Sequence, residues 1–284
     1  MFGRRTTGSA LCAYCGKLVG VRDEVCWNCG RRNPGMWGFG PVLRRLGYDA
    51  GFVPVLIWGC VALYLATLLA DPRGISMSGL SILAPSSRSL FMFGASGAIP
   101  VFGYDRWWTL LTAGWLHGSI LHIGINMLWV RQLAPAAAEL YGSPRMVIIY
   151  CVSSITGFLL TSITGLLFGP VPILGGAQFT VGASAPIFGL LGAMVHYGRR
   201  GGSRHIGSQA LYYAVVVFIF GVVMPGMGVD NYAHIGGFLG GYATSKWLDP
   251  LQPERVVHFM AAVALLLITA GSILTSLLTA QLLR

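Results

Sequence analysis

The chain has 284 residues, of which 55% are hydrophobic and only 10% are charged, and its mean hydropathy is +0.68. This composition excludes an ordinary soluble domain and predicts a membrane protein. The formal net charge of +10 is divided among several loops rather than gathered on one face. We therefore expect the lipid bilayer and its head groups to be the partner of these charges, and no nucleic acid.

The N-terminal 33 residues contain two Cys-x-x-Cys pairs separated by ten residues. Four thiolates at this spacing can surround one tetrahedral zinc ion, and a segment this short has little core of its own, so the metal would hold it folded. Two disulfides or a redox pair are the alternatives, and a reducing cytosolic location argues against disulfides. We predict a zinc-ribbon-like module over 1–33 with structural zinc and a partner that is unknown. The expected ligands are Cys12, Cys15, Cys26 and Cys29.

Behind a glycine-rich linker over 34–51, apolar segments long enough to cross a bilayer recur along the chain. The sixth is the least secure, because glycine and polar residues dilute it. The connection around 71–111 is too long for a simple turn and contains Trp107 and Trp108, which suit a bilayer interface, so we expect a structured, partly membrane-embedded outer loop. The seven predicted spans lie near residues 52–70, 112–131, 146–167, 183–198, 209–226, 231–248 and 256–281.

The distribution of arginine and lysine predicts the orientation. The first fifty residues carry eight of them, and later basic clusters fall in alternate loops, whereas the segments around 168–181 and 227–230 carry none. Because basic residues concentrate on the cytoplasmic side, the N-terminus should be cytosolic. We expect an integral, multi-pass protein of a bacterial cell (inner) membrane.

Two apolar, glycine-rich spans each begin with one reactive polar residue, Ser184 in the fourth span and His234 in the sixth. One span separates them, so both helices run the same way and the two residues should lie at similar depth near the outer rim. Stripes of small residues on both helices permit a close approach. A serine and a histidine that meet inside a membrane indicate a nucleophile and its general base. The stripes are Ala185, Gly189 and Ala193 on one helix, and Gly236, Gly237, Gly240 and Gly241 on the other.

The second span adds further polar groups. His122 and Asn126 are four residues apart and share a helix face, and both can donate hydrogen bonds to an oxyanion. On an ideal helix His117 is turned well away from His122, so we expect it to be a structural residue at the helix entrance.

These polar residues belong to three short motifs in a fixed order. The motifs are HxxxxHxxxN at His117, His122 and Asn126, GxSx at Gly182 to Ala185, and AHxGG at Ala233 to Gly237. Over roughly residues 50–250 the chain thereby resembles the rhomboid intramembrane serine proteases, and residues 139–145 also look like that family's connection after its second core helix. The resemblance implies an all-α fold, with a six-helix catalytic core over 52–250 followed by a seventh transmembrane helix over 251–284.

The same resemblance implies a Ser–His dyad that needs no catalytic cofactor. Ser184 would attack a peptide carbonyl and His234 would transfer the proton, while the oxyanion would lie among the N–H of Ser184 and the side chains of His122 and Asn126. The substrates would be transmembrane proteins cut in or near their membrane segments, in a site that opens to the outer side. Supporting roles fall to His117, Gly182, Phe188, which would pack against the histidine, and Gly237, which would let the helix of Ser184 approach.

Two positions depart from the family's pattern. Ala185 stands where the family commonly has glycine, and Thr109 follows Trp107-Trp108 where the family has an arginine, which puts the anchoring of the outer loop in doubt. The run Gly94-Ala95-Ser96-Gly97 fits GxSG, but it lies in the long loop with no long apolar helix after it. We therefore do not expect Ser96 to be the nucleophile.

Three other interpretations stay open. A non-catalytic rhomboid-like protein would bind transmembrane clients without cutting them, although such proteins usually lack the serine or the histidine. A small transporter could also use polar groups in broken helices, but the two halves show no inverted repeat. An intramembrane metal site of His117, His122 and His234 lacks an accompanying carboxylate.

Asp230 lies one turn before His234 in the sequence. We expect it to cap that helix rather than to complete a catalytic triad.

Overall fold

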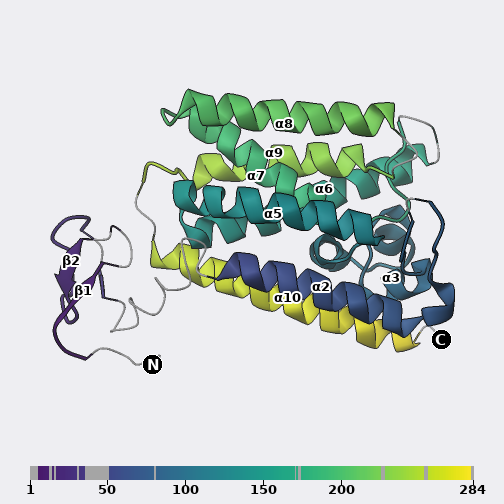
Figure 1. The fold of residues 1–284 in the computed structure, drawn as a ribbon, viewed down its shortest axis with the longest axis horizontal. Helices are drawn as coiled ribbons and strands as arrows, with labels where there is room; N and C mark the ends of the chain where they lie inside the picture. The colour runs from purple at the N-terminus through teal and green to yellow at the C-terminus, as the bar shows by residue number, and fades with distance from the viewer. Residues whose placement is uncertain are drawn as a thin grey trace.

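A computed structural model describes residues 6–12, 15, 17–30, 32–35, 51–79, 81–169, 171, 174–224, 228–252 and 255–282. Helices dominate these residues, and most of the long ones run along one axis of the molecule (Figure 1). Of the predicted linker over 34–51, only residues 34, 35 and 51 are described.

The N-terminal module is built on a two-stranded antiparallel sheet. Strand β1 (Ser9–Leu11) pairs with strand β2 (Leu18–Gly20). The small buried cluster beside the sheet consists of Val19 and cysteines, with almost no other apolar side chain. Such a core is too small to hold the module folded without a further constraint.

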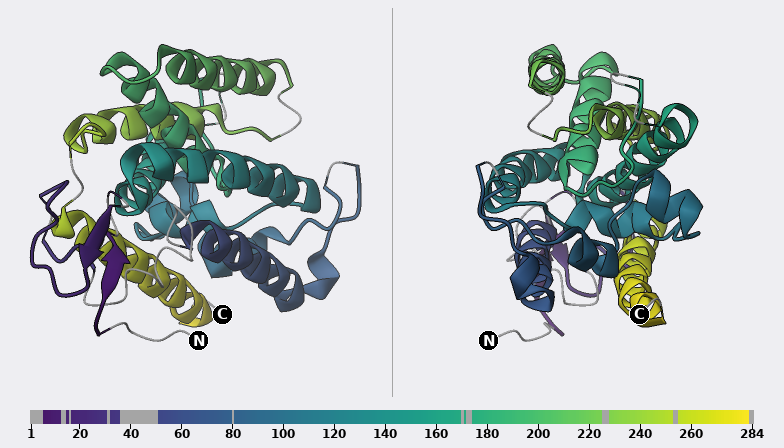
Figure 2. Two further views of the ribbon diagram at one scale, coloured as in Figure 1. Left: turned by 60° about the vertical axis from the view of Figure 1, so that its left-hand side comes forward. Right: turned by 90° about the vertical axis from the view of Figure 1, so that its right-hand side faces the viewer.

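Seven helices of sixteen residues or more follow in the part of the chain that the structure describes. They are α2 (Phe52–Ala70), α5 (Ile120–Tyr141), α6 (Ser143–Phe168), α7 (Ser184–Arg199), α8 (Arg204–Val223), α9 (Asn231–Trp247) and α10 (Val256–Leu282). Figure 2 shows the bundle from two further sides, with α8 at one edge and α2 and α10 at the opposite edge.

Four of these helices, α2, α6, α8 and α10, are long and apolar enough to cross a membrane. Only 22% of the apolar stretch is buried in α8 and in α10, so large apolar side chains cover the outside of both. Apolar surfaces of this size are unfavourable in water, whereas they are favourable in contact with the apolar chains of lipid. The chain is therefore an integral, multi-pass membrane protein. Helix α7 is shorter and lies largely buried among the others. Helix α9 is also short and buries one face, which carries its glycines.

The second predicted span, 112–131, was wrong at both ends, because α5 begins at Ile120 and ends at Tyr141. The side chain of Ser119 accepts a hydrogen bond from the backbone N–H of His122 (3.2 Å) and so begins the helix. The apolar residues before it form two short separate turns, α4 (Thr109–Thr112) and η4 (Ala113–Trp115), which pack inside the protein. Hydropathy alone does not distinguish a buried loop from a membrane helix.

The long connection between α2 and α5 is structured, as predicted. Besides α4 and η4 it contains η2 (Pro72–Gly74), α3 (Ser87–Phe93) and the π-helical turn η3 (Ile99–Gly103).

The centre of the bundle is the contact of α9 with α6 and α7. A Cβ added to Gly237 would overlap the carbonyl oxygen of Ala185, and one added to Gly241 would overlap that of Gly189. From the first contact to the second, the residue number rises by four on both helices, so α7 and α9 are parallel. On the other side of α9, Gly236 has no room for a Cβ beside the backbone of α6.

Candidate active site

Ser184 is the first residue of α7 and is half-buried. The chain reaches it through Gly182, whose φ of 138° is one that residues with a side chain rarely adopt. The N–H of Gly182 donates to the carbonyl of Ala113 (2.9 Å), which fixes this approach. At the N-terminus of a helix the first N–H groups have no intrahelical partner and favour negative charge. The hydroxyl of Ser184 therefore lies where a developing anion is stabilised.

His234 lies in the first turn of α9 and is 3% exposed. The carboxylate of Asp230 caps this helix by accepting from the N–H of Ala233 (3.0 Å), so the prediction that Asp230 is a cap is confirmed. The ring of His234 stacks on that of Phe188, with ring centroids 4.0 Å apart and planes 9° from parallel. Packing thus fixes the plane of the imidazole.

The parallel register brings Ser184 and His234 to the same level of the bundle. Ala185 lies against Gly237, so the serine is one residue before this contact and the histidine three residues before it. Phe188 lies one turn after Ser184 on α7. The imidazole of His234 stacks on the Phe188 ring and therefore lies beside α7. A hydrogen bond between the serine hydroxyl and the histidine stays a prediction.

His122 faces the same segment from α5. A Cβ added to Gly182 would lie 2.7 Å from Nε2 of His122 and 3.7 Å from Oγ of Ser184, so both atoms lie on the same side of that glycine. The N–H of Gly118 donates to Nδ1 of His122 (3.3 Å). Nδ1 is then an acceptor, so in the neutral ring the proton is on Nε2, the nitrogen near Ser184.

Asn126 lies one turn further along α5 and is 4% exposed. Its side-chain nitrogen Nδ2 donates to the carbonyl oxygen of His122 (3.0 Å). This bond fixes the amide orientation, because the opposite orientation would place two oxygens together. It uses one of the two N–H bonds on Nδ2 and leaves the second for another acceptor.

His117 is fully buried, and its ring contacts that of His122 edge to face at 5.2 Å. The prediction that the two rings are turned well apart was wrong, because it assumed one continuous helix and His117 lies before the helix begins at Ile120. Among the described residues, the one cluster of metal-ligating side chains is that of the four cysteines.

Ser96 lacks the exposure that a nucleophile needs. Its side chain is fully buried and accepts a hydrogen bond from the hydroxyl of Thr109 (3.3 Å). Its backbone pairs with Thr180 as an isolated bridge. The serine of the GxSG run is thus part of the loop's internal hydrogen bonding.

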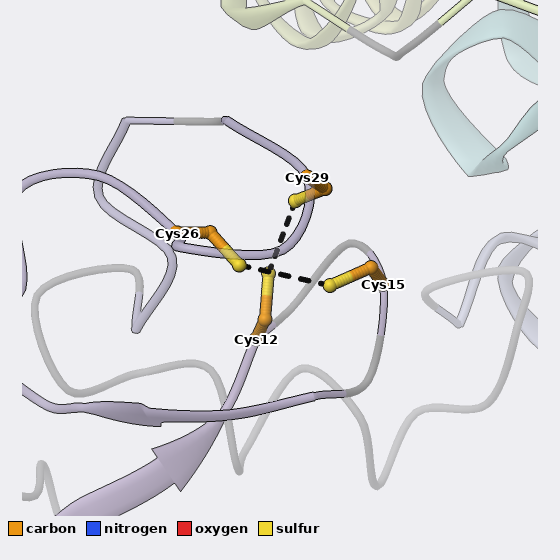
Figure 3. A group of neighbouring side chains, drawn as sticks. All are labelled: Cys12, Cys15, Cys26 and Cys29. Carbon is orange, nitrogen blue, oxygen red and sulfur yellow. Dashed lines mark hydrogen bonds between the residues drawn. The ribbon is translucent and has the colours of Figure 1, made fainter.

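The four cysteines of the N-terminal module point toward one another (Figure 3). Sulfur atoms of Cys12 and Cys29 are 3.8 Å apart and those of Cys15 and Cys26 are 3.7 Å apart. A tetrahedron with metal–sulfur bonds of about 2.3 Å has edges of about 3.8 Å, so the spacing fits zinc and is too long for disulfide bonds. These residues form a possible metal site.

The thiol of Cys15 is poised to bind a cation. Burial raises its pKa, but hydrogen bonds from the backbone of Lys17 and from the side chains of Asn28 and the neighbouring cysteines outweigh this and lower the pKa to about 6. The thiolate, which is the form that binds metal, is therefore the main form at neutral pH.

Fold and site together define a multi-pass membrane protein in which polar residues of three helices converge at one end of a close helix contact. The Rhomboid domain family matches residues 104–249, about half of the chain. The chain belongs to the rhomboid family.

Two of three similar proteins are proteases by name. Rhomboid protease GluP of Bacillus subtilis (strain 168) is 33% identical over 190 residues, which are 66% of this chain and 35% of GluP. RHOMBOID-like protein 7 of Arabidopsis thaliana is 33% identical over 187 residues, which are 64% of this chain and 55% of that protein. Rhomboid-like protease 3 of Toxoplasma gondii is 29% identical over 163 residues, 56% of this chain and 58% of that protein. The chain thus spans less than two thirds of the length of each relative.

Proposed function

We propose that this rhomboid protein is a serine endopeptidase that cleaves peptide bonds in or near the transmembrane segments of other membrane proteins. The observation that carries the proposal is the stacking of His234 on Phe188, one turn along the helix that begins with Ser184. A stacked, buried imidazole beside a serine at a helix N-terminus is the arrangement that a nucleophile and its general base require.

In the proposed reaction, Oγ of Ser184 forms a bond with the carbonyl carbon of the substrate while the imidazole of His234 takes the hydroxyl proton. Collapse of the tetrahedral intermediate breaks the C–N bond, and the imidazolium returns the proton to the leaving amine. Water then attacks the acyl-enzyme with the same imidazole as base and releases Ser184. The chemistry needs no metal or organic cofactor.

The negative charge on the carbonyl oxygen would be held by three donors. They are the N–H of Ser184, the Nε2–H of His122 and the second N–H of the Asn126 amide. The hydrogen bond from Gly118 N–H to Nδ1 of His122 leaves the proton on Nε2, where it can be donated. The hydrogen bond from Asn126 to the carbonyl of His122 orients the amide so that its second N–H is also available. Donors that are oriented before reaction stabilise the transition state without reorganisation.

The proposed substrates are single-span membrane proteins whose helices unwind near helix-breaking residues, because an intact helix hides its carbonyl groups. We place the site toward the outer side of a bacterial cell membrane, with the N-terminus in the cytosol. All seven long helices would cross the bilayer, six as the catalytic core over 52–250 and α10 as the added helix of 251–284. Residues 1–33 would form a zinc-bound cytosolic module.

The test is cleavage of a model single-span substrate in proteoliposomes. We expect Ser184→Ala and His234→Ala to lower the cleavage rate by about 10³-fold or more, since each removes a member of the dyad. Ser96→Ala is the matched control, because it removes the competing serine, and it should retain cleavage. Covalent labelling of Ser184 by a fluorophosphonate should follow the same pattern.

Cleavage that survives Ser184→Ala would refute the assignment of the nucleophile. If the wild type cuts no substrate and Ser184 is not labelled, the protein is instead a rhomboid-like binder of transmembrane clients.

A further inference from the structure

The connection between α2 and α5 contains a buried arginine that the sequence motifs do not mark. Arg106 is 1% exposed. Its guanidinium donates to the backbone oxygen of Phe91 (2.6 Å) and to that of Ser276 (3.1 Å), and it lies 4.3 Å from the centre of the Phe91 ring. Burying a guanidinium is costly unless it is hydrogen-bonded. The first bond lies within the connection, because Phe91 belongs to α3, and the second joins the connection to α10.

Ser276 of α10 is the point where three parts of this loop meet. Its side chain is fully buried, and its hydroxyl accepts a hydrogen bond from the indole N–H of Trp108 (2.9 Å). A Cβ added to Gly94 would lie only 2.6 Å from that hydroxyl oxygen. One serine therefore contacts Gly94 and Trp108 through its side chain and Arg106 through its carbonyl.

The opposite side of the same loop is bonded to the segment that leads into Ser184. Ser96 and Thr180 exchange two backbone hydrogen bonds (3.0 and 2.8 Å). The N–H of Ala98 donates to the carbonyl of Ala177 (3.0 Å), and the N–H of Gly182 donates to that of Ala113. Residues 177–182 are thus held along their length by residues 96–113.

We infer that α10 supports the nucleophile. In this inference, which rests on the proposed function, Arg106, Trp108 and Ser276 are positioning residues: they fasten the loop of residues 94–113 to α10, and the loop fixes the approach to Ser184. A helix outside the residues 104–249 that match the Rhomboid domain is then required for full activity. This chain has Thr109 where the family has an arginine that anchors the loop. In this inference Arg106 anchors the loop instead.

Three conservative variants of the full chain in proteoliposomes test this inference. Trp108→Phe keeps a ring but removes the indole donor, Ser276→Ala removes the acceptor, and Arg106→Lys keeps the charge but loses the two-pronged hydrogen bonding. Thr275→Ala is the matched control, because the Thr275 hydroxyl bonds only to Gly271 of its own helix among the described residues (2.9 Å).

Each variant should lower kcat and the rate of Ser184 labelling by a fluorophosphonate by about 10-fold, with KM changed less than about 2-fold, because a slightly displaced nucleophile reacts slowly while substrate still binds. Amide hydrogen exchange in residues 94–99 and 177–182 should accelerate by about 10-fold in the variants and not in Thr275→Ala. Exchange in α6 to α9 should be unchanged.

Wild-type labelling and wild-type exchange in all three variants would overturn the inference. So would faster exchange spread evenly over α6 to α9, because Ser276 would then serve general stability. If the wild type proves inactive, the proposed function fails separately. The exchange measurement needs no turnover, and it still decides whether α10 holds the segment before Ser184.

Discussion

At the residue scale, His122 and Asn126 act together through the main chain of α5. Asn126 donates to the carbonyl oxygen of His122, and His122 accepts from the N–H of Gly118 just before the helix. Each side chain therefore has one hydrogen bond that sets its orientation and one N–H that the proposed reaction would use for the oxyanion.

Asn126→Ala is expected to lower kcat and kcat/KM equally, by about 10²- to 10³-fold, because the lost hydrogen bond exists only when the carbonyl oxygen is charged. Steady-state cleavage measures this. Gln132→Ala removes an exposed amide from the same helix and should leave both constants unchanged. An Asn126→Ala enzyme with kcat within about 2-fold of wild type would leave the oxyanion to the backbone and His122 alone.

At the scale of elements, α7 and α9 touch through their backbones. Gly237 of α9 lies against Ala185 of α7, and Gly241 of α9 lies directly against Gly189 of α7. The other two glycines of the α9 stripe, Gly236 and Gly240, pack against α6. Since no side chain separates α7 from α9 at their contact, their spacing cannot adjust to a larger residue.

Gly241→Ala should therefore lower the free energy of unfolding by about 2–3 kcal/mol, as expected for overpacking in a tight core. Gly124→Ala provides the opposite case, because Gly124 lies within α5 and a Cβ there would meet nothing within 4 Å. Its stability should be unchanged or up to about 1 kcal/mol higher, since alanine favours helix more than glycine. Thermal unfolding in detergent compares the two, and equal midpoints would contradict the described contact.

The same elements show what the sequence could and could not predict. Local patterns were sufficient for the module's cysteines, for the part of the small-residue stripes that joins α7 to α9, and for the shared face of His122 and Asn126. The start of α5 was misplaced, because apolar loop residues that pack inside the protein look like membrane helix. The bonds of Arg106 and Trp108 to Ser276 join residues 170 and 168 positions apart, and no periodicity or motif marks either end.

At the scale of the whole molecule, the chain combines two parts that are stabilised in different ways. The helical bundle buries a large apolar core, whereas the N-terminal module buries little besides its cysteines. The folding of the module should thus depend on its metal, while the bundle should not.

Metal analysis should find one zinc ion per chain, and a chelator should remove it together with the hydrogen-exchange protection of residues 6–35. The unfolding midpoint of the bundle should not change. The depressed pKa of Cys15 stabilises the folded, metal-free module at high pH, and this contribution is lost as the pH falls through about 6. Because zinc binds the thiolate and competes with protons for it, the affinity for zinc should fall as the pH is lowered.

Cys12→Ser should lose the zinc, while Cys60→Ala, which changes a buried cysteine of α2, should retain it. Full zinc content in Cys12→Ser would exclude the four-cysteine site.

The backbone contact of α7 with α9 also limits how this protein can diversify. Helices in backbone contact along glycines and an alanine have little room to shift against each other, so we expect Ser184 and His234 to keep their relative positions. Under the proposed function, variation that changes specificity or rate should then fall in parts outside this contact, such as the loop of residues 94–113 and the sparsely buried α8. The proposed pair of Ser184 and His234 would then stay constant while the residues around it vary.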